Sequence, residues 1–295
     1  MLDVNEKSLQ RSAALYGITN ISVASMRREP VYQAEIVNQM VLGTIVPIYE
    51  EQNDFFYVEN WDGYLGWVSK ASLKTVNRAE AKAWHRASRL LVTGLYGRVS
   101  ERACETSDTL TDLVLCAMLK QLESGPDYHK VELPDGRTGY VQCALTVDAT
   151  AGKMAEATKQ GVEELARKFL GIPYLWGGTS TKALDCSGFV QTVFRMLNIA
   201  LPRDASHMTA LGTDVELDHG FTGLQTGDLI LFGKTVRRIT HVALSLGNSL
   251  FIHAEGRVRI NSLDPAYDLY AQQRHKTFLL AKRILSNQTD LTVGE

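Results

Sequence analysis

One cysteine and two histidines in the C-terminal half of the sequence have the chemistry of a nucleophile and a base. Cys186 lies in the stretch LDCSGFV and is followed by apolar residues at helical spacing. Asp185 is therefore expected to be the N-cap of a helix that begins at the cysteine. The free amide protons of a helix N-terminus favour an anion, so a lowered pKa is expected for the Cys186 thiol. The same amides are suited to a developing oxyanion.

The two histidines lie on two consecutive expected strands, ITHVALSL and SLFIHA. In each strand the apolar residues alternate on one face, which leaves His241 and His253 on the other face. If the strands form a hairpin around the segment GNS with Val242 across from Ile252, then His241 stands across from His253. Cross-strand neighbours are about 5 Å apart, so one imidazole can orient the other. Cys186 is then the nucleophile and His241 its base, with His253 fixing the tautomer. A two-residue loop would shift the register by one and separate the histidines.

The elements around these residues predict an α+β domain over residues 151–295. The stretch from 153 to 171 has apolar residues at helical spacing and is expected to be a helix that ends at a glycine C-cap, Gly171. The Cys186 helix follows, and then come expected strands in GDLILFG, ITHVALSLG, SLFIHA, GRVRINSL and FLLAKRIL. Helices followed by antiparallel strands are the order of an α+β fold.

The N-terminal half contains an internal repeat. VENWDGYLGWV at 58–68 matches VELPDGRTGYV at 131–141, an offset of 73 residues, and short strands with turns surround both stretches. Two copies of one small all-β module are therefore predicted, over residues 1–78 and 79–150. The segment 77–89 lacks Gly and Pro and is expected to be a helical linker.

Both halves resemble known families. The opening RREP, together with a GWV or GYV strand after a DG turn, resembles bacterial SH3-like (SH3b) domains. The blocks YLWGGTSTKALDCSGFV, LPRDAS, GDLILFG, ITHVALSLG and FIHAEGRVRINSL resemble the NlpC/P60 cysteine peptidases. The resemblance implies a multidomain chain in which two small all-β SH3-like barrels precede an α+β papain-like NlpC/P60 domain. In this arrangement the chain resembles the γ-D-glutamyl-L-diamino acid endopeptidases, which act on peptidoglycan-derived muropeptides.

The resemblance also implies roles for individual residues. A Cys-His-His triad falls on Cys186, His241 and His253, and it cleaves through an acyl-enzyme. In such relatives the first SH3b module walls the substrate site, where the free amine of an N-terminal L-Ala is bound. The substrate-binding residues expected on this basis are Glu29, Tyr64, Tyr174, Trp176, Asp185, Ser187 and Ser206. The second copy has Arg137 where the first has Tyr64, so only the first copy is suited to bind a cation.

Composition argues against several other classes of protein. A formal net charge of −2 and the lack of a polybasic run give no basis for binding nucleic acid or a membrane. The first residues lack the apolar segment of a signal peptide, so a cytoplasmic monomer is expected, or a secreted or periplasmic one if a signal was removed. Neither a metal nor a cofactor is expected. Cys104, Cys116 and Cys143 are expected to be small buried residues.

Three alternatives stay open at this point. The triad residues as a zinc site would supply only three ligands at unhelpful spacings. Tandem SH3b modules favour a non-catalytic wall-binding protein if the C-terminal domain is a relic. An amidase or acyltransferase on another substrate would use the same thioacyl chemistry.

Overall fold

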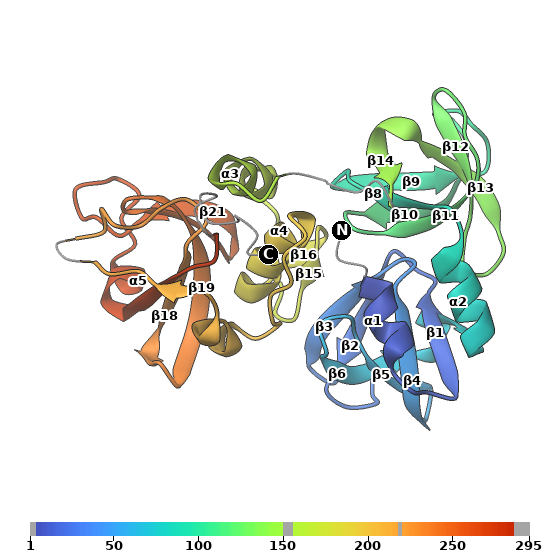
Figure 1. Cartoon of the computed structure of the whole chain (residues 1–295), viewed down its shortest axis with the longest axis horizontal. Coiled ribbons are helices and arrows are strands. Elements are labelled where there is room, and N and C mark those ends of the chain that lie inside the picture. The colour runs from blue at the N-terminus through green and yellow to red at the C-terminus, as the bar shows by residue number, and fades with distance from the viewer. Residues whose placement is uncertain (1–3, 150–155, 218–219, 286–295) are drawn as a thin grey trace, which may run out of the picture.

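The computed structural model describes residues 4–149, 156–217 and 220–285. Three parts follow one another along the chain (Figure 1): a first β-sheet module, a second β-sheet module and a C-terminal part of helices and a sheet. The first module begins with the short helix α1 (Val4–Gln10), and helix α2 (Arg78–Arg86) joins the two modules. Asn77 caps α2 in a capping box with Glu80, which confirms the predicted helical linker.

The first two modules have the same strand order. The first sheet consists of β1 (Leu15–Thr19), β2 (Val23–Arg27), β3 (Ile36–Val41), β4 (Ile45–Gln52), β5 (Phe55–Glu59), β6 (Leu65–Ser69) and β7 (Leu73–Val76). The second consists of β8 (Arg89–Val92), β9 (Tyr96–Ser100), β10 (Thr109–Val114), β11 (Met118–Glu123), β12 (Tyr128–Glu132), β13 (Thr138–Gln142) and β14 (Thr146–Asp148). The orders are β3-β2-β6-β5-β4-β1-β7 and β10-β9-β13-β12-β11-β8-β14.

The bounds of β2, β3, β5 and β6 recur 73 residues later in β9, β10, β12 and β13, which is the offset read from the sequence. The short 3-10 helices η1 (Lys70–Ser72) and η2 (Cys143–Leu145) recur in the same way. The prediction of closed barrels is not met, because the end strands of each sheet do not pair with each other within the described ranges.

A tight turn interrupts the segments 41–49 and 112–119, which are apolar enough to read as continuous strands. At equivalent positions of the two copies, Gly43 has φ 81° and Cys116 has φ 69°. A Cβ atom at Gly43 would lie 2.1 Å from the Met118 carbonyl oxygen, so glycine is required there. Cys116 is buried as predicted, whereas Cys104 is exposed and Cys143 is half-buried. Cys104 lies in the surface loop between β9 and β10, where no core is available.

The C-terminal part has the predicted α+β order. Its helices are α3 (Lys159–Lys168), α4 (Cys186–Met196), η3 (Ala205–Ala210) and α5 (Gln272–Thr277), and β15 (Thr179–Ser180) pairs with β16 (Ala183–Leu184). The main sheet has the order β17-β22-β18-β19-β20-β21. Its strands are β17 (Thr213–Asp214), β18 (Leu229–Thr235), β19 (Arg238–Gly247), β20 (Leu250–Glu255), β21 (Arg257–Ser262) and β22 (Phe278–Arg283).

The first helix of this part is shorter than expected. The Thr158 side chain caps α3, which ends at Lys168 rather than at Gly171, and part of the expected helix lies outside the described residues. Gly171 has φ 87° and turns the chain so that its amide donates to the Val258 carbonyl of β21. The glycine therefore directs the chain toward the sheet after the helix has ended.

The β19–β20 hairpin differs from the predicted register by two residues. Leu244 pairs with Ile252, and the loop between Gly247 and Leu250 has only two residues. Carried on as a regular ladder, that loop would place His253 across from Leu244, on the face opposite His241. A bulge between Ser245 and Gly247 adds one residue to β19 and restores the face that the histidines share.

The three parts share one large hydrophobic cluster. It contains Phe169, Phe189 and Phe194 of the C-terminal part together with Val41 of the first module and Leu115 of the second. Figure 1 shows α4 between the C-terminal sheet and the two modules, where it can contact all three. The helix that begins at Cys186 is therefore held by every part of the chain.

Candidate active site

The Cys186 thiol lies at the N-terminus of α4, as predicted. Asp185 is the N-cap, and its Oδ1 accepts a 2.7 Å hydrogen bond from the Gly188 amide. The backbone amides of Val242 and Ser187 hydrogen-bond to the Cys186 sulfur, which places the sulfur beside the residue that follows His241. The cysteine is 9% exposed, so the thiol is buried among these groups.

The predicted lowering of the Cys186 pKa is wrong. Burial and the Asp185 carboxylate raise the pKa of the thiol to about 11, because together they outweigh the two amide hydrogen bonds and the nearby Arg203 cation. At neutral pH the Cys186 side chain is thus a thiol, and it would need a base to take its proton before it could act as a nucleophile.

The two histidines are in direct contact. Nε2 of His241 lies 2.7 Å from Nδ1 of His253, and both rings are buried. The Phe232 ring is tilted against His241 and the Phe251 ring is edge-on to His253, with ring centroids 5.7 and 4.9 Å apart. Burial in this aromatic setting lowers the pKa of both histidines, so both imidazoles are neutral at pH 7.

A third side chain, Asn261 on β21, extends this contact and was missed in the sequence. Its Oδ1 lies 3.0 Å from Nε2 of His253, and its Nδ2 donates a 2.9 Å hydrogen bond to the Leu269 carbonyl. Asn261 pairs with Phe251 in the β20–β21 ladder, so it is a diagonal neighbour of His253 on the same face. Strand alternation in SLFIHA and VRINSL could have indicated it.

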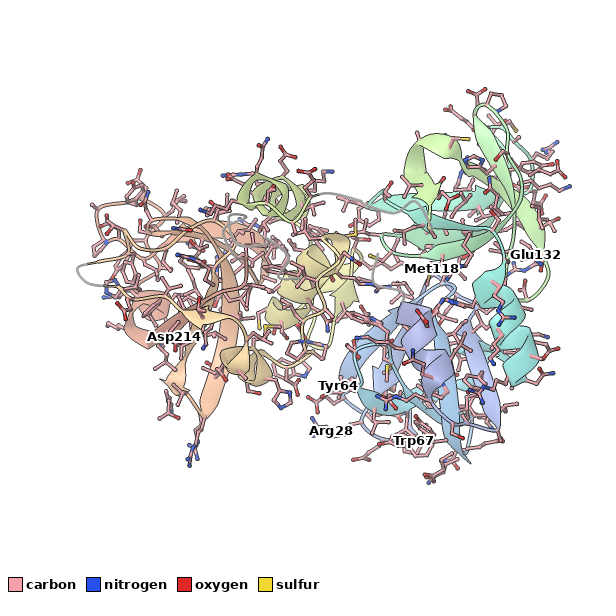
Figure 2. All side chains as sticks on the ribbon, viewed as in Figure 1. Arg28, Tyr64, Trp67, Met118, Glu132 and Asp214 are labelled. Carbon is pink, nitrogen blue, oxygen red and sulfur yellow. The ribbon has the colours of Figure 1, made fainter. Side chains whose placement is uncertain are left out.

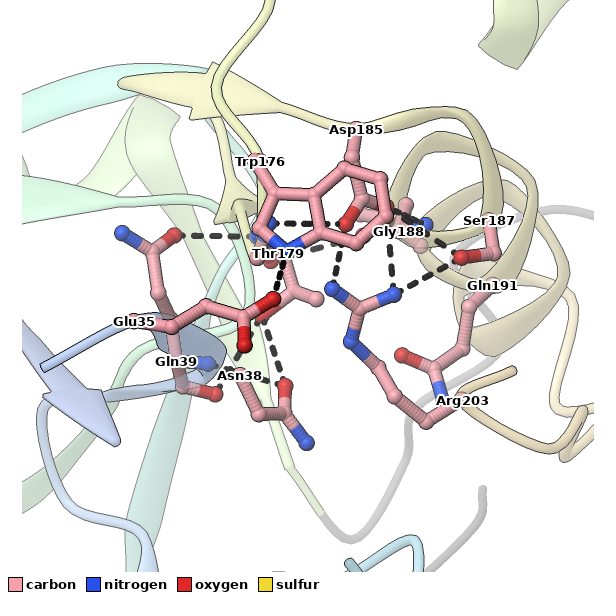
Figure 3. A network of polar contacts seen from close by, with 12 residues as sticks. Glu35, Asn38, Gln39, Trp176, Thr179, Asp185, Ser187, Gly188, Gln191 and Arg203 are labelled. Atoms are coloured by element: carbon pink, nitrogen blue, oxygen red, sulfur yellow. Dashed lines mark hydrogen bonds and ion pairs between the residues drawn. The ribbon is translucent and has the colours of Figure 1, made fainter. Parts of the chain in front are cut away.

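Arg203, in the stretch LPRDAS, was also missed. It binds the side chains of two predicted substrate-binding residues, Asp185 and Ser187. Its guanidinium contacts both oxygens of Asp185, at 2.5 and 3.1 Å, and the Ser187 hydroxyl at 2.7 Å (Figure 3). Asp185 also accepts from the amides of Gly177 and Gly188. These donors engage both carboxylate oxygens, so Asp185 and Ser187 hold the loop before the nucleophile in place.

The first module reaches this loop with a carboxylate that the sequence did not single out. Glu35 accepts a 2.6 Å hydrogen bond from Nε1 of Trp176 (Figure 3). Its other oxygen pairs with Arg28 at 2.7 Å. Gln39 of β3 accepts from the Thr179 amide at 2.9 Å. Glu29, the carboxylate predicted to bind the substrate amine, is exposed, and the hydrogen bond to Trp176 comes from Glu35 instead.

The other predicted binding residues lie on both sides of the junction between the first module and the C-terminal part. Tyr64 and Arg28 lie on the side of the first module that faces the C-terminal part (Figure 2). Burial and the Asp204 carboxylate raise the pKa of Tyr64, and burial together with Cys186 and Asp185 raises the pKa of Tyr174 to about 12. Both phenols therefore stay protonated as hydrogen-bond donors. Trp176 is 61% exposed, and Ser206 is exposed in η3.

The second module holds the same loop from its other end. The Tyr96 hydroxyl donates to the Thr181 carbonyl at 2.5 Å, and the Thr181 hydroxyl donates to the Leu95 carbonyl at 2.6 Å. Lys182 pairs with Asp112 at 2.7 Å. The β15–β16 hairpin, which leads directly into Asp185, is therefore fixed by both modules.

Two further properties follow from the described part of the chain. No group of three or more His, Cys, Asp or Glu side chains within it is arranged to hold a metal ion. Among the helices in residues 4–149, 156–217 and 220–285, none is long and apolar enough to cross a membrane.

Comparisons with known proteins agree with this architecture. Residues 171–277 match the family model of the NlpC/P60 family, and residues 22–74 match that of the bacterial SH3 domain. The first match contains Cys186, His241 and His253, and the second contains Glu35 and Tyr64. The bacterial SH3 match covers the first β-module, and neither match covers the second.

Relatives and solved structures cover most of the chain. A γ-D-glutamyl-L-lysine dipeptidyl-peptidase of Bacillus subtilis is 30% identical over 233 residues, 74% of this chain and 72% of the relative. Dipeptidyl-peptidase 6 of Lysinibacillus sphaericus is 27% identical over 85% of this chain and 92% of its own length. The crystal structure of an NlpC/P60 family protein from Bacillus cereus has a TM-score of 0.77 over 92% of this chain and 100% of that one, at 22% identity, and so shares the fold.

Proposed function

Because this chain belongs to the NlpC/P60 family, we propose that it is a cysteine endopeptidase that hydrolyses the γ-D-glutamyl-L-diamino acid bond of peptidoglycan-derived muropeptides. The observation that carries the proposal is the 2.7 Å contact between two neutral, buried histidines beside a helix-terminal thiol. The relatives named for γ-D-glutamyl-L-lysine cleavage support the substrate class.

The reaction divides into two steps. The Cys186 sulfur attacks the γ-carbonyl carbon of D-Glu while His241 takes the thiol proton, and that proton then passes to the amine of the departing diamino acid. His241 next takes a proton from water, whose oxygen attacks the thioester. The γ-carboxyl is released, and the proton returns to the sulfur. His253 orients His241 and stabilises its imidazolium through the Nε2–Nδ1 contact.

On the N-terminal side of the substrate, the first module supplies the wall. We assign the binding of a free L-Ala amine to the region around Tyr64 and Glu35, because an ammonium group in a partly buried site needs a carboxylate and oxygen acceptors. Glu35 replaces Glu29 in this assignment since it is the carboxylate that contacts the Trp176 loop. We also propose that the second module is a diverged SH3b domain, on the basis of its strand order, and that the three domains span 1–78, 79–150 and 151–295.

The test is mass spectrometry of L-Ala-γ-D-Glu-diaminopimelate and its L-Lys counterpart, each with and without an N-acetyl cap. Wild type is expected to cut the uncapped peptides, and Cys186→Ala to cut none. Cys104→Ala is the matched control, because Cys104 is exposed in the second module. If wild type cuts none of the four peptides, the proposed activity is wrong. If it cuts capped and uncapped peptides alike, only the amine recognition is wrong.

A further inference from the structure

The contact between the two histidines can carry either of two proton arrangements. A neutral imidazole has one N–H and one bare nitrogen, so one of Nε2 of His241 and Nδ1 of His253 donates and the other accepts. If His241 donates from Nε2, its Nδ1 is bare and can accept a proton. If His253 donates instead, Nδ1 of His241 already carries its proton and His241 cannot act as a base there. The 2.7 Å distance alone fits both cases.

The direction of the hydrogen bond between the two histidines is decided where this series of contacts ends, at the Leu269 carbonyl. This oxygen accepts from the Ser262 amide and from Nδ2 of Asn261, both at 2.9 Å. A carbonyl has no proton to give, so a flipped Asn261 amide would place two acceptor oxygens in contact. The NH2 group of Asn261 must therefore face Leu269, and its Oδ1 must face His253.

The proton positions then follow from one group to the next. Oδ1 of Asn261 only accepts, so Nε2 of His253 carries the proton in the 3.0 Å contact between them. The neutral His253 ring has a bare Nδ1, which accepts from Nε2–H of His241. His241 is left with a bare Nδ1.

We propose that Asn261 is a positioning residue which, through His253, holds His241 in the tautomer whose Nδ1 is free to take the thiol proton of Cys186. This inference rests on the proposed function, and it extends the Cys-His-His set by an amide that a backbone carbonyl orients. The tautomer is thereby fixed by the β20–β21 pairing and the 263–270 loop, and not by the histidines themselves.

The charged groups around the histidines have to be considered as well. Glu255 at the end of β20 pairs with Arg259 of β21 at 2.5 Å and also with Arg274 of α5. Burial is the largest cause of the lowered pKa of both rings; the two arginines add to it, and Glu255 opposes it at His253. None of these charged side chains has a hydrogen bond to either ring among the described contacts, so they do not set which nitrogen donates. Asn261 sets it.

The first experiment reads the tautomers directly in the whole chain without substrate. Long-range ¹H–¹⁵N NMR of histidine-labelled protein at pH 7 is expected to show the proton on Nε2 of both His241 and His253, assigned with His241→Gln and His253→Gln. In Asn261→Leu this order is expected to be lost, with His253 moving toward the Nδ1–H form. A wild-type His253 protonated on Nδ1, or unchanged tautomers in Asn261→Leu, would overturn the proposal. Failure to cut muropeptides would leave this readout intact and would count only against the proposed function.

The second experiment is kinetic and uses a matched pair of variants. Asn261→Leu removes the acceptor and is expected to lower kcat roughly 10- to 100-fold with little change in KM, as for loss of a buried, orienting hydrogen bond. Asn261→Asp keeps the oxygen that accepts from His253 but loses the NH2 group that donates to the Leu269 carbonyl. It is therefore expected to lose less activity than Asn261→Leu, and to move the acid limb of the pH profile upward because a carboxylate favours the imidazolium. Equal losses in both variants with an unmoved acid limb would contradict the positioning role. If Asn261→Leu does not fold, Asn261→Ser, too short to reach His253, takes its place.

Discussion

The buried ion pair between Arg203 and Asp185 gives the sharpest prediction for the loop before the nucleophile. Both residues are almost fully buried, at 5% and 6% exposure, and the guanidinium makes three contacts with Asp185 and Ser187. Arg203→Met would leave a buried carboxylate without its counter-ion, a change that costs about 3–5 kcal/mol in comparable sites. Asp185 keeps the amides of Gly177 and Gly188, so a loss near the lower end, about 3 kcal/mol, is expected.

The loss has a chemical consequence at the thiol. Asp185 raises the pKa of Cys186 and Arg203 lowers it, so removal of the arginine is expected to raise that pKa further. Alkylation of Cys186 by iodoacetamide at a fixed pH below 11 should then be slower than in wild type. In the double variant Asp185→Asn/Arg203→Met the buried charge is gone, and at least 1 kcal/mol of the lost stability, on the order of one hydrogen bond, should return.

Urea unfolding followed by fluorescence, together with hydrogen exchange of the α4 amides, measures the effect. Arg167→Met is the matched control, because Arg167 forms an exposed pair with Glu163 at 2.7 Å and should lose less than about 0.5 kcal/mol. If Arg203→Met costs no more than this control, or if the double variant is no more stable than the single one, the reasoning about the buried charge is wrong.

Two other predictions follow from the pKa shifts and from the junction. Burial lowers the pKa of His253 to about 4 and that of His241 well below 6.5. Because the proposed reaction needs neutral rings, the acid limb of kcat/KM should lie below pH 6.5, and a limb above pH 7 would contradict the burial argument. Because these folded-state pKa values are depressed, the contribution to stability should be complete above pH 6.5 and be lost as the pH falls toward 4, which thermal unfolding at several pH values would show. Glu35→Ala should lower kcat/KM for the uncapped peptide at least about tenfold, the effect of a lost charge-assisted hydrogen bond, whereas Glu29→Ala should stay near wild type; the reverse order would restore the original assignment to Glu29.

The junction between the modules and the C-terminal part was the least predictable feature. A carboxylate was expected from the first module, and the RREP stretch indicated Glu29. The structure instead brings Glu35, six residues later in the chain between β2 and β3, to the Trp176 indole, and we base the proposed amine site on that contact. Nothing in the local sequence fixes how two domains dock, since that depends on which surfaces become buried together.

The pKa of Cys186 likewise depends partly on local sequence and partly on tertiary contacts. The sequence predicts the N-cap and the start of the helix, because both depend on neighbours within four residues. It could not predict how deeply the thiol is buried, nor that Asp185 would share its charge with Arg203, 18 residues away. The amide of the helix N-terminus lowers the pKa as predicted, but burial of the thiol, a tertiary effect, and the adjacent Asp185 carboxylate together outweigh it.

By itself the sequence determined the elements and their faces: the repeat at an offset of 73 residues, the helix that begins at Cys186, and the strands that carry His241 and His253. These follow from periodicity, capping and repeated motifs, which act over short distances along the chain. Only the tertiary structure decided the hairpin register with its bulge, the amide of Asn261 beside His253, and the side chains that meet at the junction. Each of these depends on contacts between distant segments, and alternation along a strand fixes the face of a residue but not its partner.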